Sequence, residues 1–223
     1  MATHLWRRFN LTKMEQSYHH IKRQILNGKL LPMRDISEES LQTELGMSRT
    51  PVHEALKKLE SEYFVHIYPK KGTVVAGITF DIVNSIYEVR QLLEPYCATK
   101  QCSKPPVNEL IAIKNAFLSL SPQMDDAELI EDYISLDTQL HKLILSSLDN
   151  IFIGNIMNII FDHDYRIRVL TTHSDQYYMD NVTAHVQIIE AILGNQPTQA
   201  GELMKSHIEK SRNETVKTLL KNQ

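Results

Sequence analysis

Residues 41–75 run LQTELGMSRTPVHEALKKLESEYFVHIYPKKGTVV, and this stretch decides the fold of the N-terminal part of the chain. Its first half predicts two short helices, because apolar residues recur three and four positions apart on both sides of Gly46, which suits a helix C-terminus. Ser37 is a good N-cap for the first helix. Thr50 is a good N-cap for the second, with Pro51 at the first helical position, where its missing N–H costs nothing. Two short helices joined by a tight turn are typical of a helix-turn-helix.

The second half of this stretch predicts strands. Residues 64–78 run FVHIYPKKGTVVAGI, in which β-branched and aromatic residues surround a turn at residues 69–72. That pattern predicts a β-hairpin with a basic tip. Before the helix-turn-helix, residues 13–27 have apolar residues at helical spacing, so we expect one more helix there. Together these elements predict a winged helix-turn-helix domain over residues 1–77.

From Phe80 onward the pattern is helical to the end, with proline-containing breaks at residues 105–106 and 194–197. The expected helices lie near residues 81–102, 106–119, 125–147, 150–171, 177–194 and 197–221. We therefore expect an all-helical bundle over residues 80–223. The predicted fold class is mainly α, with an N-terminal winged helix-turn-helix followed by this bundle.

Composition and charge narrow the function. No run reaches the ~18 apolar residues of a transmembrane helix, and the first residues lack the apolar core of a secretory signal, so we expect a cytoplasmic protein without a membrane partner. Cys97 and Cys102 are expected to be reduced thiols.

Charge is unevenly distributed along the chain. The net charge is −3, but residues 1–77 hold 12 Lys and Arg against 8 Asp and Glu, a charge of +4. The remaining residues hold 12 Lys and Arg against 19 Asp and Glu, a charge of −7. A basic N-terminal part on an acidic body is expected when only that part meets phosphate.

The string SRTPV-EAL, followed by the KKGTVV of the hairpin, resembles the DNA-binding domain of the GntR family of bacterial regulators. The resemblance covers residues 13–77 and implies a recognition helix that enters the major groove of DNA by its N-terminal end. The expected DNA contacts are Ser48, Arg49, Thr50 and His53 on this helix, and Lys70, Lys71 and Gly72 at the tip of the wing. A winged helix that makes only protein contacts is the alternative.

Arg49 is the expected base-reading residue, because a guanidinium can bind O6 and N7 of guanine together. Ser48 and Thr50 are suited to contact phosphates, and the lysines of the wing suit a phosphate or a minor-groove contact. The family usually has Arg at the position of His53, so the role of this shorter, neutral side chain stays open. A Gly that is usual near residues 63–64 is also absent, which affects the turn into the wing.

Four ionisable residues of the C-terminal part form a candidate metal site. Asp137 and His141 are four positions apart and share one face of a helix. His185 and His207 lie on two other expected helices, and three helices of a bundle can direct such groups into one cavity. Three imidazoles and a carboxylate suit a divalent ion, with Zn²⁺ or Ni²⁺ preferred, and leave positions open for a ligand. Spacing alone is equally compatible with histidines that are buried with ordinary hydrogen-bond partners or exposed to solvent, and that bind no metal.

Residues 80–220 resemble the FCD ligand-sensing domain of the FadR-like branch of the GntR family. The matching features are YEVRQLLEPYCA, a D-x₃-H pair, H-x-x-I-x-x-A-I and a final M-x-x-H. The resemblance implies that Asp137, His141, His185 and His207 hold a divalent metal ion. A metal with open positions attracts a small carboxylate, for which Arg90, Arg166 and Arg168 are candidate partners, Arg90 above all. Salt bridging is the alternative for each arginine, and the neighbouring His163 and His173 are expected to be exposed.

The predicted function is a transcription regulator, favoured as a repressor, that binds double-stranded operator DNA as a homodimer. The expected effector is a small organic or sugar acid. Two alternatives remain. A metalloenzyme is disfavoured because no HExxH-like general base accompanies the metal ligands, so we expect no enzymatic activity. The second alternative is a protein that binds DNA constitutively and holds a purely structural metal. The sequence excludes this alternative less firmly than it excludes an enzyme.

Overall fold

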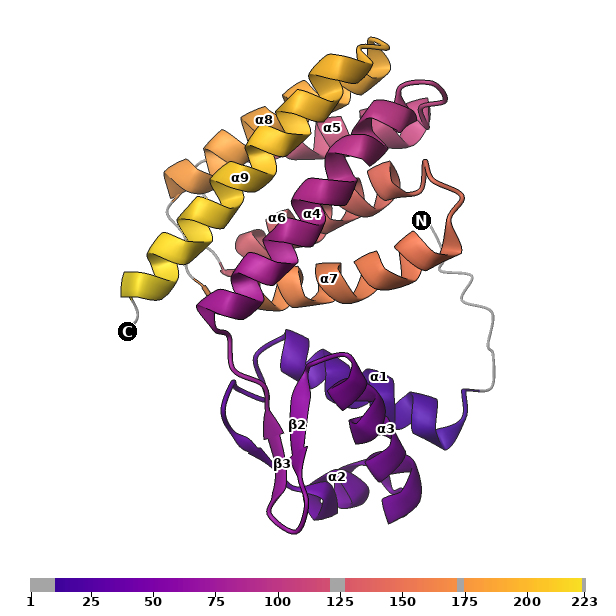
Figure 1. Ribbon diagram of the computed structural model, residues 1–223, viewed down its shortest axis with the longest axis vertical. Helices are drawn as coiled ribbons and strands as arrows, with labels where there is room; N and C mark the ends of the chain where they lie inside the picture. The colour runs from indigo at the N-terminus through magenta and orange to yellow at the C-terminus, as the bar shows by residue number, and fades with distance from the viewer. Residues whose placement is uncertain (1–10, 121–126, 172–174, 222–223) are drawn as a thin grey trace. The chain divides into compact units, whose positions relative to one another are not determined.

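The computed structural model describes residues 11–120, 127–171 and 175–221. The chain forms two compact units, Met1–Gly77 and Ile78–Gln223 (Figure 1). The first is a small winged helix-turn-helix and the second contains only helices among its described residues, which confirms the predicted fold class. None of the helices in the described ranges combines the length and the apolar character that a membrane span requires.

The N-terminal unit follows the predicted order with one addition. Its elements are α1 (Lys13–Leu26), β1 (Asp35–Ile36), α2 (Glu38–Leu45), α3 (Arg49–Ser61), β2 (Val65–Tyr68) and β3 (Gly72–Val75). The three strands form an antiparallel sheet in the order β1-β3-β2. The sequence predicted only a connection where β1 lies, because a two-residue strand carries no usable alternation.

Local capping explains the helix-turn-helix. The Ser37 hydroxyl accepts a hydrogen bond from the Ser40 N–H, and Gly46 ends α2 in the left-handed conformation at φ +62°, both as predicted. The second helix begins earlier than predicted, at Arg49, with Ser48 as its N-cap residue in an extended conformation. Arg49 and Thr50 therefore lie within the first turn of α3. The opposite face of α3 is buried against α1 and the sheet through Val52, Ala55, Leu56 and Leu59.

The C-terminal unit is a bundle of α4 (Phe80–Gln101), α5 (Val107–Ser119), α6 (Ala127–Leu145), α7 (Ile151–Leu170), α8 (Asp175–Leu193) and α9 (Pro197–Lys221). Each helix begins and ends within two residues of its predicted limits. The long helices α4 and α9 lie side by side (Figure 1). Gly201 permits this approach, since a Cβ there would meet the Thr99 hydroxyl of α4 at 2.6 Å.

Both cysteines are free thiols buried in the bundle, Cys97 with no exposed surface. Burial raises the pKa of Cys97 to about 12, so very little thiolate forms at pH 8. We expect Cys97 of the folded protein to react with iodoacetamide at pH 8 at least ~100-fold more slowly than a free cysteine. Mass spectrometry of timed reactions, with urea-unfolded protein as the control, measures this rate. Rapid alkylation of the folded protein would contradict the burial of this thiol.

Candidate functional site

The start of α3 presents a row of exposed polar side chains. Ser48, Arg49 and Thr50 are exposed, and the Arg49 side chain keeps 80% of its accessible surface. His53, one turn further along, is half-buried, with its Nδ1 3.2 Å from a carboxylate oxygen of Glu38. The other oxygen of Glu38 lies 3.8 Å from Arg49 Nε. Glu38 of α2 therefore lies close to both side chains, a contact that the sequence did not predict.

The wing faces this row across a groove of about 650 Å³. The groove is lined by Ile36, Glu38, Glu39, Gln42, Arg49, His53, Ile67, Tyr68, Pro69, Lys70, Gly72 and Thr73. The structure thus brings Arg49 and His53 of the helix together with Lys70 and Gly72 of the wing. Lys71 is exposed beside them. Lys70 and Gly72 have positive φ angles of +63° and +115°, so the tip is a tight turn in which Gly72 adopts a conformation that favours glycine.

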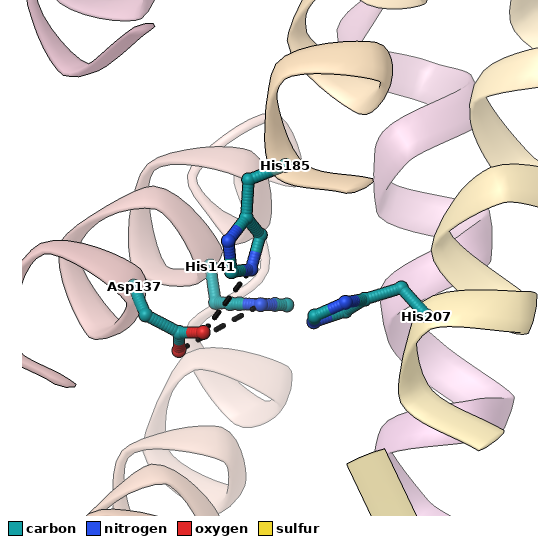
Figure 2. Close-up of side chains that lie close together, drawn as sticks. All are labelled: Asp137, His141, His185 and His207. Atoms are coloured by element: carbon teal, nitrogen blue, oxygen red, sulfur yellow. Dashed lines mark ion pairs between the residues drawn. The ribbon is translucent and has the colours of Figure 1, made fainter. Parts of the chain in front are cut away.

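In the C-terminal unit, Asp137, His141, His185 and His207 converge in the bundle interior. Figure 2 shows Asp137 and His141 extending from α6, His185 from α8 and His207 from α9 toward one point. One potential ligand atom from each residue lies within 4.8 Å of the other three. All four side chains are buried, with exposures of 0–4%. The predicted set of residues is thus brought together by three helices, as a metal site requires.

Several polar atoms of this cluster have no hydrogen-bond partner in the described residues, although they are buried. They are His141 Nε2, His185 Nδ1 and His207 Nδ1. The Asp137 carboxylate lies among these rings, with Oδ1 3.1 Å from His185 Nε2 and Oδ2 3.8 Å from His141 Nε2 (Figure 2). Buried polar atoms are normally satisfied, so unpaired nitrogens on three buried imidazoles that surround one carboxylate favour a shared partner. A divalent cation supplies that partner, because it accepts lone pairs from imidazole nitrogen and from carboxylate oxygen. The donor set therefore fits a metal ion.

The protonation states also fit. Burial lowers the pKa of His185, and it holds the pKa of His207 well below its usual range, so both rings are neutral near pH 7. Burial alone would raise the pKa of Asp137, but the Arg168 guanidinium and the adjacent imidazoles outweigh it and hold that pKa well below its usual range. Neutral imidazoles and an ionised carboxylate are the forms that bind metal ions.

Buried charged groups orient two of these side chains. Glu94 of α4 accepts a hydrogen bond from His141 Nδ1, which leaves Nε2 directed into the cluster. Arg168 Nη1 of α7 lies 2.6 Å from Asp137 Oδ2. A carboxylate on the distal nitrogen of a histidine is a common support for a metal ligand.

Two known families match this chain. Residues 13–75 match "Bacterial regulatory proteins, gntR family", and residues 85–210 match "FCD domain". The chain is a GntR-family transcription regulator with an FCD domain. The gntR family is described as regulatory proteins, and the relatives given below are named as transcription regulators rather than enzymes, in agreement with the prediction.

Individual relatives agree with this assignment. The uncharacterized HTH-type transcriptional regulator YdhC of Bacillus subtilis (strain 168) is 22% identical over 192 residues, covering 86% of each chain. The gluconate operon transcriptional repressor of the same organism is 29% identical over 143 residues, 63% of this chain but 57% of its own length. Among solved structures, the Zn²⁺-bound FCD domain of TM0439 covers 65% of this chain and matches 98% of its own, with 23% identity and a TM-score of 0.53.

The three candidate effector-binding arginines of the FCD domain are all buried. Arg90 places Nε 2.6 Å from Glu94 and Nη1 2.6 Å from Asp164. Arg168 bridges Asp164 and Asp137 at 2.7 and 2.6 Å. Both therefore make the interhelical salt bridges that the sequence left as the alternative, and their carboxylate-binding role stays a prediction. Burial lowers the pKa of Arg166 to about 10.

These contacts form a buried ring of charge that sequence reasoning missed. The ring runs from His141 through Glu94, Arg90, Asp164 and Arg168 to Asp137, and it closes where Asp137 Oδ2 lies 3.8 Å from His141 Nε2. Glu94 and Asp164 each lie four residues from an arginine partner, which is a signal that the sequence does carry.

The prediction for His163 was wrong. It is only 6% exposed, because the C-terminal half of α7 is buried on most of its circumference. His173 lies outside the described residues.

Proposed function

We propose that this GntR-family protein is a repressor whose homodimer binds an operator, and that a small carboxylate effector at a metal ion in the FCD domain releases the DNA. The observation that carries the proposal is the convergence of four buried potential ligand atoms, from Asp137, His141, His185 and His207, within 4.8 Å of one another. A bound cation would satisfy imidazole nitrogens of this cluster that have no hydrogen-bond partner among the described residues. The name of the gluconate operon relative, a transcriptional repressor, supports repression.

These four residues would hold the metal ion, and the Zn²⁺-bound relative supports zinc, with Ni²⁺ as the second choice. The bound ion would supply a positive charge with open coordination positions to a carboxylate. The positive charge of three arginines, Arg90, Arg166 and Arg168, would stabilise the bound carboxylate. Glu94 and Arg168 keep His141 and Asp137 oriented toward the ion.

A homodimer would place two copies of α3 about one helical turn of DNA apart, roughly 34 Å, on a pseudo-palindromic site. The effector shifts the balance only if it binds the released arrangement more tightly than the DNA-bound one. The charge ring includes Arg90 and Glu94 of α4, the first helix after the DNA-binding unit in sequence. We propose that the bound effector acts on α4 by changing the distribution of charge around this ring. Because its partner is chromosomal DNA, we place the protein in the cytoplasm.

Arg49→Ala is expected to weaken operator binding by about 1–3 kcal/mol and to relax sequence choice at one base pair, because it removes the base-reading guanidinium. Lys71→Ala is the matched control, which should weaken binding to all duplexes alike and lower its salt dependence, as loss of a phosphate contact does. Fluorescence anisotropy on operator and single-base variants measures both. Unchanged binding by Arg49→Ala would remove Arg49 from the base-reading role.

An effector at ~100 times its Kd should stabilise the metal-loaded protein by about 2.7 kcal/mol and raise its Tm by roughly 5–10 °C. Thermal-shift screening of small organic and sugar acids identifies it. The metal-stripped protein should show no shift with the same acid. If no acid shifts the Tm of the loaded protein, the metal is structural and the protein binds DNA constitutively.

A further inference from the structure

A second groove, of about 320 Å³, lies between α8 and α9. Its lining residues occur at the same spacing on both helices, so each helix contributes one continuous stripe. They are Asp180, Thr183, Ala184 and Gln187 on α8, and Leu203, Ser206, His207 and Lys210 on α9. The two helices lie side by side along this groove (Figure 1). The volume is near the lower end of the range for small-ligand sites, ~300–1,000 Å³.

His207 connects this groove with the metal-binding cluster. Of the four cluster residues, it alone lines the groove, and its 4% exposure exceeds the 0–2% of the other three. Figure 2 shows that its ring extends from α9 into the cluster. His207 is therefore the one described side chain that both the groove and the buried cluster share.

We infer that the groove between α8 and α9 is the entrance through which a divalent cation reaches and leaves the cluster, with His207 as the first ligand to capture it. This inference rests on the metal-binding part of the proposed function. The remaining ligands are more deeply buried, so an ion that arrives along the groove meets His207 before them.

An ion pair joins the two walls of this entrance. Lys210 Nζ of α9 lies 3.0 Å from Asp180 Oδ2 of α8, and their side chains are 56% and 40% exposed. The Asp180 carboxylate attracts a cation to the groove, while the Lys210 ammonium opposes its passage. Because both groups are in solvent, salt should weaken their influence on the rate of binding.

Bulky substitutions in the groove test the inference. Ala184→Trp and Ser206→Trp each place an indole in the entrance, and Lys205→Trp places one on the exposed neighbouring position of α9, outside the groove. Full-length protein is loaded with Zn²⁺, and release to excess EDTA and rebinding are followed by stopped flow with a chromogenic chelator. We expect the groove variants to bind and release Zn²⁺ at least tenfold more slowly, with Kd within twofold of the parent. Lys205→Trp should match the parent.

Three results would overturn the inference. The first is a release rate in both groove variants equal to that of Lys205→Trp. The second is slower release with a matching gain in affinity, which indicates a tighter site rather than a narrower entrance. The third is a parent protein that binds no Zn²⁺, which also removes the metal from the proposed function, whereas the first two leave that function intact. Ser206→Trp is at an exposed position, so it serves if Ala184→Trp fails to fold.

The charged pair offers an independent check. Lys210→Met should speed Zn²⁺ binding at least threefold at low salt, and the difference should disappear at 1 M salt, where the screening length is ~3 Å. Equal rates at low salt would contradict the role of Lys210 at the entrance.

Discussion

The variant with both His185→Ala and His207→Ala should retain no divalent metal after purification and dialysis. The double substitution removes one ligand on α8 and one on α9, which leaves Asp137 and His141 on a single helix. Two ligands from one helix cannot provide the four-coordinate shell that Zn²⁺ prefers. Elemental analysis by mass spectrometry measures the metal content of the protein as purified and after incubation with Zn²⁺.

The control for this result is the pair His19→Ala with His66→Ala, which removes two exposed imidazoles outside the cluster. This control should bind as much Zn²⁺ as the parent. Circular dichroism establishes that both double variants keep their helices. Full metal occupancy in a folded protein that carries both His185→Ala and His207→Ala would refute the site.

Arg90→Met should lower the free energy of unfolding by about 3–5 kcal/mol, because it leaves Glu94 and Asp164 as buried carboxylates that have lost a charged partner. The Arg90 guanidinium, together with His141, lowers the pKa of Glu94 to about 2 in spite of the burial that would raise it. Without Arg90, the two buried carboxylates must either stay ionised, at a high cost in free energy, or bind protons. Urea unfolding followed by circular dichroism measures the change.

Arg212→Met is the matched control for this substitution. Arg212 is half-buried and donates to the neutral side-chain oxygen of Asn84 at 2.8 and 3.1 Å, so its loss strands no charge. Its replacement should cost about 1 kcal/mol. Equal small losses in the two variants would mean that the charge ring adds little to stability.

Local signals in the sequence account for most of the fold. Capping residues such as Ser37 and Gly46 are visible in the sequence and set the limits of α2. The strand β1 was missed because its pairing with β3 depends on residues far away in the sequence, such as Val74 opposite Asp35. Hydrogen bonding across the sheet, rather than local preference, makes that strand.

Burial of charge is where sequence reasoning was weakest. The spacing of Asp137 and His141 placed them on one face of a helix. The assignment of His185 and His207 to the same site depended mainly on the resemblance to the FCD domain. His163 and the partners Glu94 and Asp164 lie on helices that bury polar and charged side chains. A polar residue is expected to be exposed unless its partner is known. Here the partners are far apart in the sequence, with 47 residues between Glu94 and His141 and 74 between Arg90 and Asp164.

We propose that the C-terminal ligand site controls DNA binding by the N-terminal winged helix. Fluorescence anisotropy of full-length, metal-loaded protein on a duplex from the region upstream of its own gene, with and without the acid found by thermal shift, tests it most directly. We predict salt-sensitive binding that the acid weakens by about tenfold or more, a coupling that disappears when the metal is removed. An affinity that neither salt nor any acid changes, or no affinity for any duplex, would contradict it.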